Sequence, residues 1–304
     1  MKFDRIGQVS DGFHVLGHRS LPVYLQDAQQ PALFDSGLSC LAPLYLEQMQ
    51  STLKGRSPAF LFLTHVHFDH CGGAALFKKA YPEMVIAASQ RAAQIVTRPN
   101  ALKLIAQLNQ VAATEIVPPG EKETEPPAFE PFTVERVLAE GDRVELEPGL
   151  WVEVMATPGH TRDFLSYYLP QRKILVASEA VGVAQLNGDI ITEFLVDYQA
   201  YLESMQRLSR LPLEVLCQGH HWVFTGQDAR DYLQRSLQAA HDYYNWVMRL
   251  LDQEQGDVER VVQLVKAQEW DNRQGVKQSE GAYLLNTQAR VRHLAARAGW
   301  LDPA

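Results

Sequence analysis

The sequence predicts an α/β fold in which layers of strands and helices alternate, followed by a helical C-terminal extension. Three observations support this prediction. Short apolar segments alternate with segments of helical periodicity over residues 1–225. Several histidines stand directly after segments that are predicted to be strands. Beyond residue 225 strand signals are few, so we expect one domain over 1–225 and a helical extension over 226–304.

Strand and helix patterns alternate through the first third of the chain. Residues 13–16, 23–25 and 32–34 are short, apolar and separated by glycine, proline and polar residues, which is typical of a meander of strands. The elements predicted after them are a helix over 43–53, a buried strand over 59–64, a helix over 74–80 and a strand over 85–88.

The middle and the end of the chain contain fewer strands and longer helices. Residues 118–131 hold five prolines and are predicted to form a surface loop. The predicted strands are 151–155, 164–169, 174–177 and, as the last one, 215–218. Residues 164–169 and 174–177 are predicted to form a hairpin, and residues 187–188 are typical of a two-residue hairpin turn. The predicted helices are 100–114, 197–211, 228–252, 257–268 and 279–298.

The composition limits the classes of partner. The 304 residues carry 28 lysines and arginines, 36 aspartates and glutamates, and a net charge of −8. No basic cluster is present, which argues against nucleic-acid binding because that binding needs neutralised phosphates. The first residues lack the apolar core of a signal peptide, and the apolar runs are too short to cross a bilayer. We expect a cytoplasmic protein with a small-molecule substrate, with no nucleic-acid or membrane partner, and leave a homodimer open.

A cluster of histidines and one aspartate indicates a metal site. His65 and His67 stand two residues apart after a predicted strand, so in an extended segment both side chains point the same way and reach one ion. Asp69 and His70 follow where the chain turns towards a helix, and they are placed to reach a second ion. Imidazole and carboxylate are ligands that Zn²⁺, Fe²⁺ and Mn²⁺ accept.

Two later histidines stand in similar positions. His160 follows a predicted strand in a Pro-Gly turn, and His220 follows another strand and a glycine. α/β folds place their sites at such strand ends. We expect both to be metal ligands, with His221 as the alternative to its neighbour His220.

These motifs together resemble the metallo-β-lactamase superfamily. Residues 64–70 match its HxHxDH motif, 157–161 its third motif and 218–220 its last Gly-His motif. The resemblance implies an αββα sandwich of two mixed sheets flanked by helices. It assigns the first metal to His65, His67 and His160, and the second to Asp69, His70 and His220. Residues 104–109, 200–212 and the helical tail are similar to the thioesterase-like quinolone-signal response subgroup of that superfamily.

One position departs from the family pattern. Where the family has a Gly-Asp pair whose aspartate bridges both metals, this chain has Ser178 and Glu179. The longer carboxylate of Glu179 is compatible with bridging, with binding one metal, or with a role behind the ligands. We expect Glu179 to be a ligand.

The resemblance implies hydrolysis by a metal-activated hydroxide. Two divalent ions, with zinc favoured over iron or manganese, lower the pKa of a shared water. Asp69 then binds the second metal and orients the hydroxide as the catalytic carboxylate. Asp35 and Thr161 are candidates for fixing the imidazole rings. Cys71 and Cys217 are expected to be buried free thiols, since three scattered cysteines predict no disulfide framework.

The substrate is the least constrained part of the prediction, because one fold hosts many reactions. The helix over 100–114 and the helical tail are expected to cover the metals and form a pocket. A small acyl thioester or ester is the favoured substrate. Two alternatives remain open, an iron-dependent persulfide-type dioxygenase and a non-enzymatic regulator that keeps the metal core. The candidate substrate-binding residues are Phe68, Asn109, Phe194, His221 and Tyr283.

Overall fold

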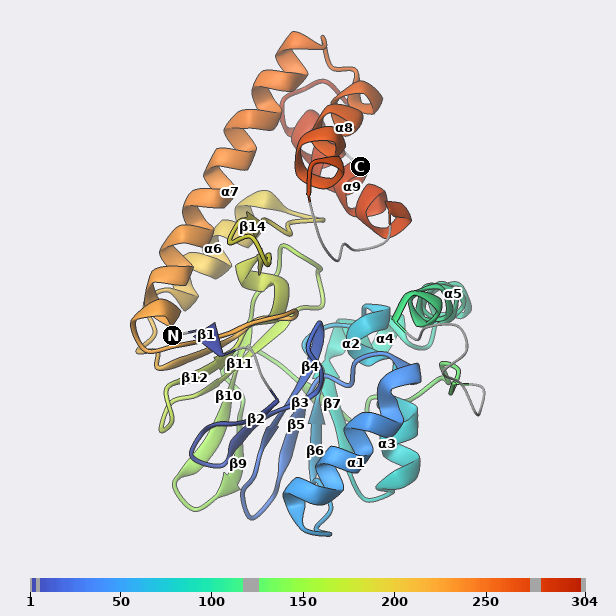
Figure 1. Cartoon of the computed structure of the whole chain (residues 1–304), viewed down its shortest axis with the longest axis vertical. Helices are drawn as coiled ribbons and strands as arrows, with labels where there is room; N and C mark the ends of the chain where they lie inside the picture. The colour runs from blue at the N-terminus through green and yellow to red at the C-terminus, as the bar shows by residue number, and fades with distance from the viewer. Residues whose placement is uncertain (1, 4–5, 117–125, 274–279, 302–304) are drawn as a thin grey trace.

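The computed structural model describes residues 2–3, 6–116, 126–273 and 280–301. Two sheets face each other at the centre, helices cover their outer faces, and three C-terminal helices extend the molecule along its long axis (Figure 1). This arrangement is the α/β sandwich that the sequence predicts, so the predicted fold class is confirmed.

The first sheet has seven strands in the described chain, in the order β2-β3-β4-β5-β6-β7-β8. Strands β2 to β5 form an antiparallel meander, and β5 to β8 are parallel. All three residues of β6 are buried, as the apolar run before the histidines predicts. The strands are β2 (Gly7–Ser10), β3 (Phe13–His18), β4 (Leu21–Gln26), β5 (Ala32–Phe34), β6 (Phe60–Phe62), β7 (Val85–Ser89) and β8 (Arg136–Leu138).

The second sheet has the order β1-β16-β15-β12-β11-β10-β9. Its neighbours are antiparallel except for β12 and β15, which run parallel and therefore end at the same edge. The strands are β1 (Lys2–Phe3), β9 (Arg143–Glu147), β10 (Leu150–Ala156), β11 (Leu165–Leu169), β12 (Ile174–Val176), β15 (Val215–Cys217) and β16 (Val223–Thr225). A separate hairpin joins β13 (Val183–Ala184) to β14 (Ile190–Ile191) around the predicted turn.

Aromatic side chains fill the space between the sheets. The ring of Tyr167, on the second sheet, lies 5.7 Å from Phe34 and 5.2 Å from Phe62, both on the first sheet. The Tyr167 hydroxyl donates to the Leu63 carbonyl at 2.7 Å. Burial of such rings is a large favourable term, and this bond fixes the two sheets to each other two residues before His65.

Helices cover both outer faces. The first sheet is covered by α1 (Ala42–Leu53), α3 (Ala74–Ala80) and α4 (Gln90–Ile95). α2 (Phe68–Cys71) is a single turn after β6, and α5 (Pro99–Ile116) packs against α2 (Figure 1). The second sheet is covered by α6 (Tyr198–Leu208) and the start of α7 (Gln227–Gln253). Packing against the sheets buries the apolar face of each helix.

The C-terminal helices share a core with the second sheet. Leu175 and Phe224, from the sheet, belong to the same buried cluster as Tyr232 and Val247 of α7 and Val291 of α9. α8 (Val258–Lys266) and α9 (Glu280–Arg297) pack against each other and against α7 (Figure 1). The helical extension therefore joins the sandwich through a continuous apolar core.

Several predicted elements need correction. The segment at 215–218 is not the last strand, because β16 follows it and pairs with both β15 and β1. β1, β2, β8 and β9 were not predicted. β1, β2 and β8 are short, and β8 is largely exposed. β9 does alternate, with Val144 and Leu146 buried, and this pattern was missed. Part of the predicted loop over 118–131 lies outside the described residues. Among the described helices, none combines the length and apolar character that crossing a membrane requires.

Candidate metal centre

The predicted ligands lie together at one edge of the sandwich. His65 stands three residues after β6, His160 follows β10, Glu179 follows β12 and His220 follows β15. β12 and β15 are parallel neighbours, so the residues that follow them leave the sheet side by side. The fold thus brings together residues that are up to 155 positions apart in the chain.

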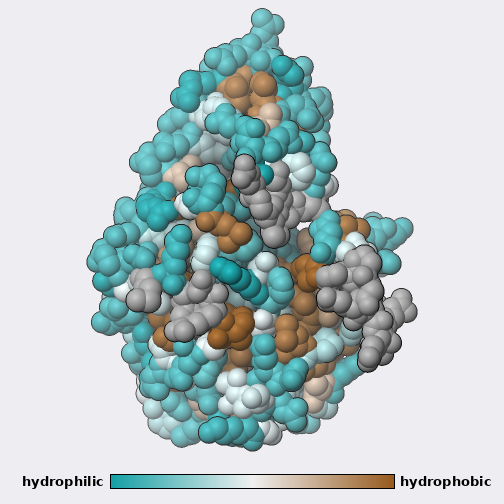
Figure 2. Space-filling view, in the orientation of Figure 1, coloured by the Kyte–Doolittle hydropathy of each residue, from teal (hydrophilic) through white to brown (hydrophobic). Residues whose placement is uncertain are grey.

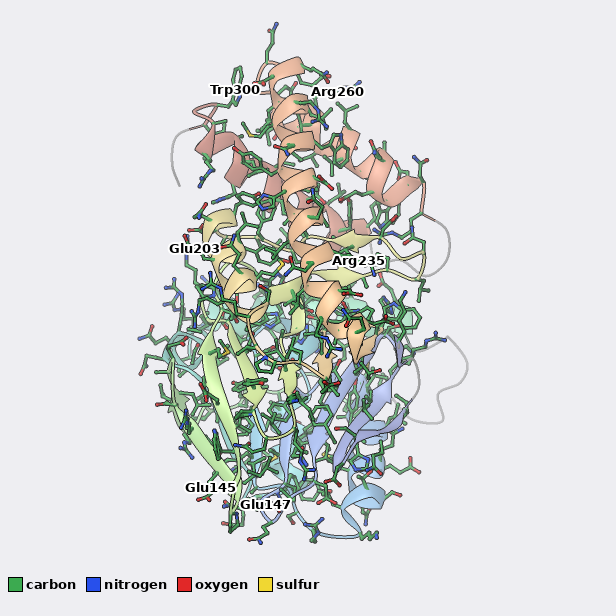
Figure 3. All side chains as sticks on the ribbon, turned by 90° about the vertical axis from the view of Figure 1, so that its left-hand side faces the viewer. Glu145, Glu147, Glu203, Arg235, Arg260 and Trp300 are labelled. Carbon is green, nitrogen blue, oxygen red and sulfur yellow. The ribbon has the colours of Figure 1, made fainter. Side chains whose placement is uncertain are left out.

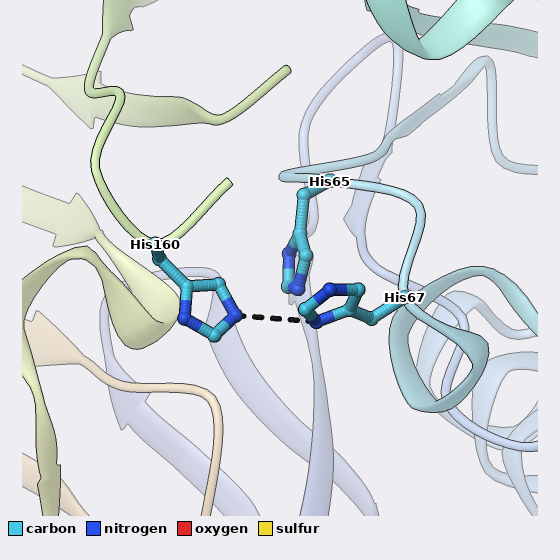
Figure 4. Close-up of side chains that lie close together, drawn as sticks. All are labelled: His65, His67 and His160. Carbon is cyan, nitrogen blue, oxygen red and sulfur yellow. Dashed lines mark hydrogen bonds between the residues drawn. The ribbon is translucent and has the colours of Figure 1, made fainter. Parts of the chain in front are cut away.

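The first cluster consists of His65, His67 and His160. One ring nitrogen of each lies within 4.8 Å of the others. Nε2 of His160 is 3.2 Å from Nδ1 of His67, and the His65 ring lies against both (Figure 4). All three were predicted to hold the first metal, and the structure places them at one point.

The second cluster consists of Asp69, His70 and His220. Their ligand atoms also lie within 4.8 Å of one another. Oδ2 of Asp69 is 3.8 Å from Nε2 of His70 and 3.7 Å from Nε2 of His220. These are the three residues that the resemblance assigns to the second metal. His221 faces the adjoining cavity instead.

Glu179 lies between the two clusters. Its Oε1 is 3.0 Å from Nε2 of His70 and 2.9 Å from Nε2 of His220, whereas its Oε2 is 3.9 Å from Nε2 of His65. The Ser178 hydroxyl donates to Oε2 at 2.7 Å. Of the roles that the sequence left open, the position of Glu179 fits bridging best.

Four of the five clustered imidazoles are oriented by a hydrogen bond on the ring nitrogen that faces away from the other ligands. Nδ1 of His70 pairs with Oδ2 of Asp35 at 2.9 Å. Asp35 is itself held by the backbone and hydroxyl of Thr64, and the same hydroxyl lies 3.0 Å from Nδ1 of His65. Such partners fix the ring orientation and raise the basicity of metal-binding histidines. The expected role of Asp35 is confirmed.

Two backbone carbonyls orient the rings of His160 and His220. Nδ1 of His160 donates to the Glu193 carbonyl at 2.6 Å, and Nδ1 of His220 donates to the Ser20 carbonyl at 3.1 Å. The expected role of Thr161 is wrong, because its buried hydroxyl has no hydrogen-bond partner among the described residues. Sequence offers no sign of a carbonyl partner, since every residue type carries one.

The donor set fits divalent metal ions. Nε2 of His65 is buried and makes no hydrogen bond within the described part of the chain, a costly state for a polar atom unless a ligand meets it. Burial lowers the pKa of His65 well below its usual range and that of His160 to about 3, so both rings are neutral and able to bind metal. Buried imidazole nitrogens and carboxylate oxygens that converge in this way are typical ligands of zinc, iron and manganese.

The two carboxylates and the second-cluster histidines are electrostatically coupled. Although burial raises the pKa of Glu179, the positive charges and hydrogen bonds of His70 and His220 hold it well below its usual range. Burial lowers the pKa of His70, but Glu179, Asp69 and Asp35 raise it well above 6.5. The negative charge of the carboxylates therefore draws positive charge into this cluster, which divalent ions would supply.

A cavity of about 470 Å³ opens directly onto the ligands. Its apolar wall includes Phe68 and three residues of α5, which are Leu108, Ala112 and Ile116. α9 contributes Ala282, Leu285 and Asn286 on another side. Figure 2 shows hydrophobic surface beside α5 and below the C-terminal helices, within a mostly hydrophilic face. The size and lining are those of a small-molecule site.

The predicted substrate-binding residues divide into two groups. Phe68 and His221 line the cavity. Asn109 lies behind the wall, where its amide nitrogen donates to the Phe68 carbonyl at 2.9 Å and its oxygen accepts from the Ser39 hydroxyl at 2.6 Å. Asn109 therefore positions the turn that carries Phe68, and it is not among the lining residues.

Phe194 and Tyr283 also lie outside the cavity lining. Phe194 is fully buried and packs edge-on against the rings of Tyr198 and Tyr243. The Tyr283 hydroxyl donates to Glu269 at 2.8 Å. Sequence alone does not distinguish an aromatic residue that packs in the core from one that lines a cavity, because both positions favour the same residue types.

Sequence reasoning missed several polar residues that line the cavity, among them His18, Gln185, Glu193 and Arg273. None of these four belongs to a motif, and only the tertiary fold brings them to the metals. Cys71 and Cys217 are buried free thiols, as expected, and burial raises the pKa of both.

The fold and the paired clusters define the class of protein. The family model of the metallo-beta-lactamase superfamily matches residues 18–220, and the chain belongs to this superfamily of metal-dependent hydrolases. Among curated proteins, the human acyl-coenzyme A thioesterase MBLAC2 is 25% identical over 232 residues, which is 73% of this chain and 80% of that protein. A hydroxyacylglutathione hydrolase of Brucella anthropi is 29% identical over 177 residues, or 56% of this chain and 50% of that protein.

Solved structures show the same fold at low identity. The metallo-beta-lactamase family protein TTHA1429 from Thermus thermophilus superposes with a TM-score of 0.67 at 17% identity, over 96% of this chain and 95% of that chain. The superfamily protein ST1585 from Sulfolobus tokodaii gives a TM-score of 0.57 at 17% identity, over 94% and 98% of the two chains. Both comparisons include most of the C-terminal helices, so they support the architecture of the whole chain.

Proposed function

We propose that this protein is a dinuclear metal-dependent hydrolase that cleaves a small acyl thioester or ester. The observation that carries the proposal is the position of the two ligand clusters, joined by Glu179, at the wall of a cavity of about 470 Å³. The same cavity has an apolar side, which suits an acyl group, and a polar side around the ligands. Zinc is the metal that we propose first.

Different residues are proposed to orient the water, support the metal ligands and contact the acyl chain. Two bound divalent ions would lower the pKa of a bound water from about 15.7 to near 7. Asp69 lines the cavity, and we propose that its carboxylate orients the attacking water. Asp35 and the Glu193 carbonyl hold His70 and His160 in place. Phe68, Leu108 and Ile116 present apolar surface for the acyl chain and exclude water.

Two relatives support this substrate class. One is named an acyl-coenzyme A thioesterase and the other a hydroxyacylglutathione hydrolase, and both names denote hydrolysis of an acyl compound. The ligand set and the apolar wall of this chain suit the same chemistry. We therefore extend the substrate class to this chain, and no particular substrate.

The test is metal analysis of protein purified without added metal, followed by a panel of acyl thioesters, esters and phosphodiesters. We expect about two zinc ions per chain, loss of turnover on chelation, and turnover of at least one thioester. Turnover of phosphodiesters alone, or no turnover with zinc, iron or manganese, would contradict the proposal. Iron-dependent oxygen consumption with a persulfide would establish the dioxygenase alternative instead.

A further inference from the structure

His18 is a cavity residue that is joined to the second metal cluster through Ser20. His18 ends β3, and Ser20 lies in the turn before β4. The backbone N–H of Ser20 donates to Nδ1 of His18 at 3.2 Å, and the Ser20 carbonyl accepts from Nδ1 of His220 at 3.1 Å. These two bonds hold the His18 ring near a ligand of the second cluster, and all three residues line the cavity.

The bond from Ser20 determines which nitrogen of His18 can donate. Because Nδ1 accepts a hydrogen bond, the proton of the neutral ring is on Nε2. Burial lowers the pKa of His18 from 6.5, so the neutral form prevails at pH 7. The described part of the chain provides this Nε2–H with no acceptor, and the ring is only half-buried. The ring therefore offers a donor of fixed direction to a molecule in the cavity.

The wall around His18 is rich in hydrogen-bond donors. His221 and Arg273 line the same cavity, and Arg273 and His18 both act electrostatically on His221. Arg273 comes from the C-terminal part of the chain, which extends beyond the ends of the sheets (Figure 3). Its guanidinium donates to the Gln185 side chain at 3.0 Å and has further N–H groups. A molecule that lies against this wall is expected to carry acceptor atoms there.

The donor-rich wall and the apolar wall suit different parts of a substrate. Leu108, Ala112 and Ile116 of α5 offer no side-chain donor, so they suit a hydrocarbon acyl chain. The bond that is cleaved has to reach the metal ligands, so the acyl chain extends from them along α5. The wall around His18 is then available to the thiol or alcohol part of the substrate, which hydrolysis releases.

We propose that the Nε2–H of His18 donates a hydrogen bond to a carbonyl oxygen in the thiol or alcohol part of the substrate, and that His18 thereby determines specificity for the leaving group. The inference rests on the proposed function and deepens it, because it assigns the part of the cavity that holds the leaving group. A substrate without this oxygen leaves the donor unpaired and is therefore selected against.

The experiment compares two propanoyl thioesters on the zinc-loaded full chain. One contains N-acetylcysteamine, whose amide offers the carbonyl oxygen. The other contains 1-pentanethiol, which has a chain of the same length and no such oxygen. The quantity compared is the ratio of kcat/KM for the first thioester to kcat/KM for the second. Because each variant is tested with both substrates, the different reactivities of the two thiols cancel when variants are compared.

Two substitutions separate the donor from the bond to Ser20. His18→Asn places an amide oxygen near the position of Nδ1, so it keeps the bond from Ser20 and loses the donor at Nε2. His18→Gln places an amide nitrogen near the position of Nε2 and keeps a donor there. We expect the ratio to fall about fivefold in His18→Asn and to stay within about twofold of the original in His18→Gln. His14→Asn is the matched control, because His14 is a half-buried histidine of the same strand outside the cavity lining.

Two further measurements distinguish a role in binding from a role in structure. Competition with a chromogenic chelator is expected to give the same zinc affinity for His18→Asn and for the original chain. Calorimetry with the ketone analogues of both substrates, in which a methylene group replaces the sulfur, measures affinity without turnover, with and without zinc. The ratio of the two affinities is expected to fall about fivefold in His18→Asn.

The outcomes are distinct. No hydrolysis of either thioester, with an affinity ratio that falls in His18→Asn, overturns the proposed function but supports the role of His18. Ratios that are equal in the original chain and in His18→Asn, in kinetics and in affinity, overturn the inference. Weaker zinc binding in His18→Asn, with equal losses on both substrates, also overturns it, because His18 would then act only through Ser20 and His220.

A measurement on the original chain decides if His18→Asn does not fold. Nitrogen-15 spectra of the histidine-labelled chain report the Nε2–H of His18, which is identified by its absence in His18→Gln. We expect this resonance to shift when the amide-containing ketone binds and to stay in place when the alkyl ketone binds. The same response to both ketones would overturn the inference.

Discussion

The longer carboxylate of Glu179 fits because of the residue that faces it. Oε1 of Glu179 lies within 3.0 Å of Nε2 of both His70 and His220. A Cβ added at Gly219 would collide with this oxygen. The absence of a side chain at 219 therefore provides the room that the extra methylene of glutamate needs, compared with the aspartate of the family pattern.

Gly219→Ala is expected to displace Glu179 and weaken metal binding. Since displaced supporting groups cost about 10–100-fold in metal affinity, we expect zinc affinity to fall by at least about tenfold while the fold is kept. Competition with a chromogenic chelator measures this. Gly281→Ala is the matched control, because its added Cβ meets no atom within 4 Å. Unchanged zinc affinity in Gly219→Ala would mean that Glu179 does not bind metal from this position.

Asp35→Asn tests the support of His70. Asp35 is 4% exposed and contacts Nδ1 of His70, and an asparagine keeps its shape but loses its charge. We expect a loss of about 10–100-fold in zinc affinity and a far-UV circular dichroism spectrum like that of the original chain. Zinc binding as tight as in the unchanged protein would contradict the role given to Asp35.

The elements differ in how far sequence alone predicts them. The helix over 100–114 has helical periodicity, and the hairpin of 164–169 with 174–177 has two largely apolar runs joined by a turn. They appear as α5 and as β11 with β12. β8 and β16 have three residues each, and short strands are defined by their neighbours rather than by their own pattern.

The junction of α9 and α6 makes stability depend on pH. Nε2 of His293 accepts a hydrogen bond from the backbone N–H of Tyr198, the first residue of α6. Burial lowers the pKa of His293 from 6.5. The nearby Asp197 raises it in part, and Arg297 and Arg162 lower it, so the net shift is downward. The unfolded state therefore binds this proton more readily than the folded state does.

The sign follows from linkage. Above pH 6.5, His293 is neutral in both the folded and the unfolded state, so it does not change the free energy of unfolding. Below pH 6.5 the unfolded state binds the proton first, so the free energy of unfolding decreases. We expect the free energy of unfolding in urea to decrease between pH 7.5 and pH 5.5, and to decrease less in His293→Gln, whose amide oxygen still accepts the bond. An identical pH dependence in both proteins would exclude this junction as the cause.

At the scale of the whole molecule, a buried ion network connects the C-terminal helices to the metal centre. Arg290 of α9 is 1% exposed, pairs with Glu269 at 3.0 Å and donates to the Thr192 carbonyl. The next residue, Glu193, carries the carbonyl that orients His160. The C-terminal helices thus form part of the support of the metal ligands.

Arg290→Met is expected to lower the free energy of unfolding by about 3 kcal/mol, because breaking a buried ion pair leaves an unpaired charge. Arg292→Met on the same helix is the control. Its ion pair with Glu259 is exposed, so its loss is expected to cost below about 1 kcal/mol. Chemical denaturation measures both, and equal small effects would show that the Arg290 network contributes little.

The metal ligands could be predicted from sequence, but the cavity and the supports could not. Four ligands stand within residues 65–70, and two more follow recognisable Gly-containing turns. The supports of His160 and His220 are backbone carbonyls, which carry no residue signature. Glu193 and Arg273 reach the cavity from separate loops, so only the assembled fold shows that they belong to it.

The most direct test of the account is a crystal structure of the zinc-loaded chain with anomalous diffraction data at the zinc absorption edge. We predict two peaks, one among His65, His67 and His160 and one among Asp69, His70 and His220, with the Glu179 carboxylate between them. No peak at either cluster, or His220 turned away from Glu179 with a single ion bound, would contradict the proposed dinuclear centre.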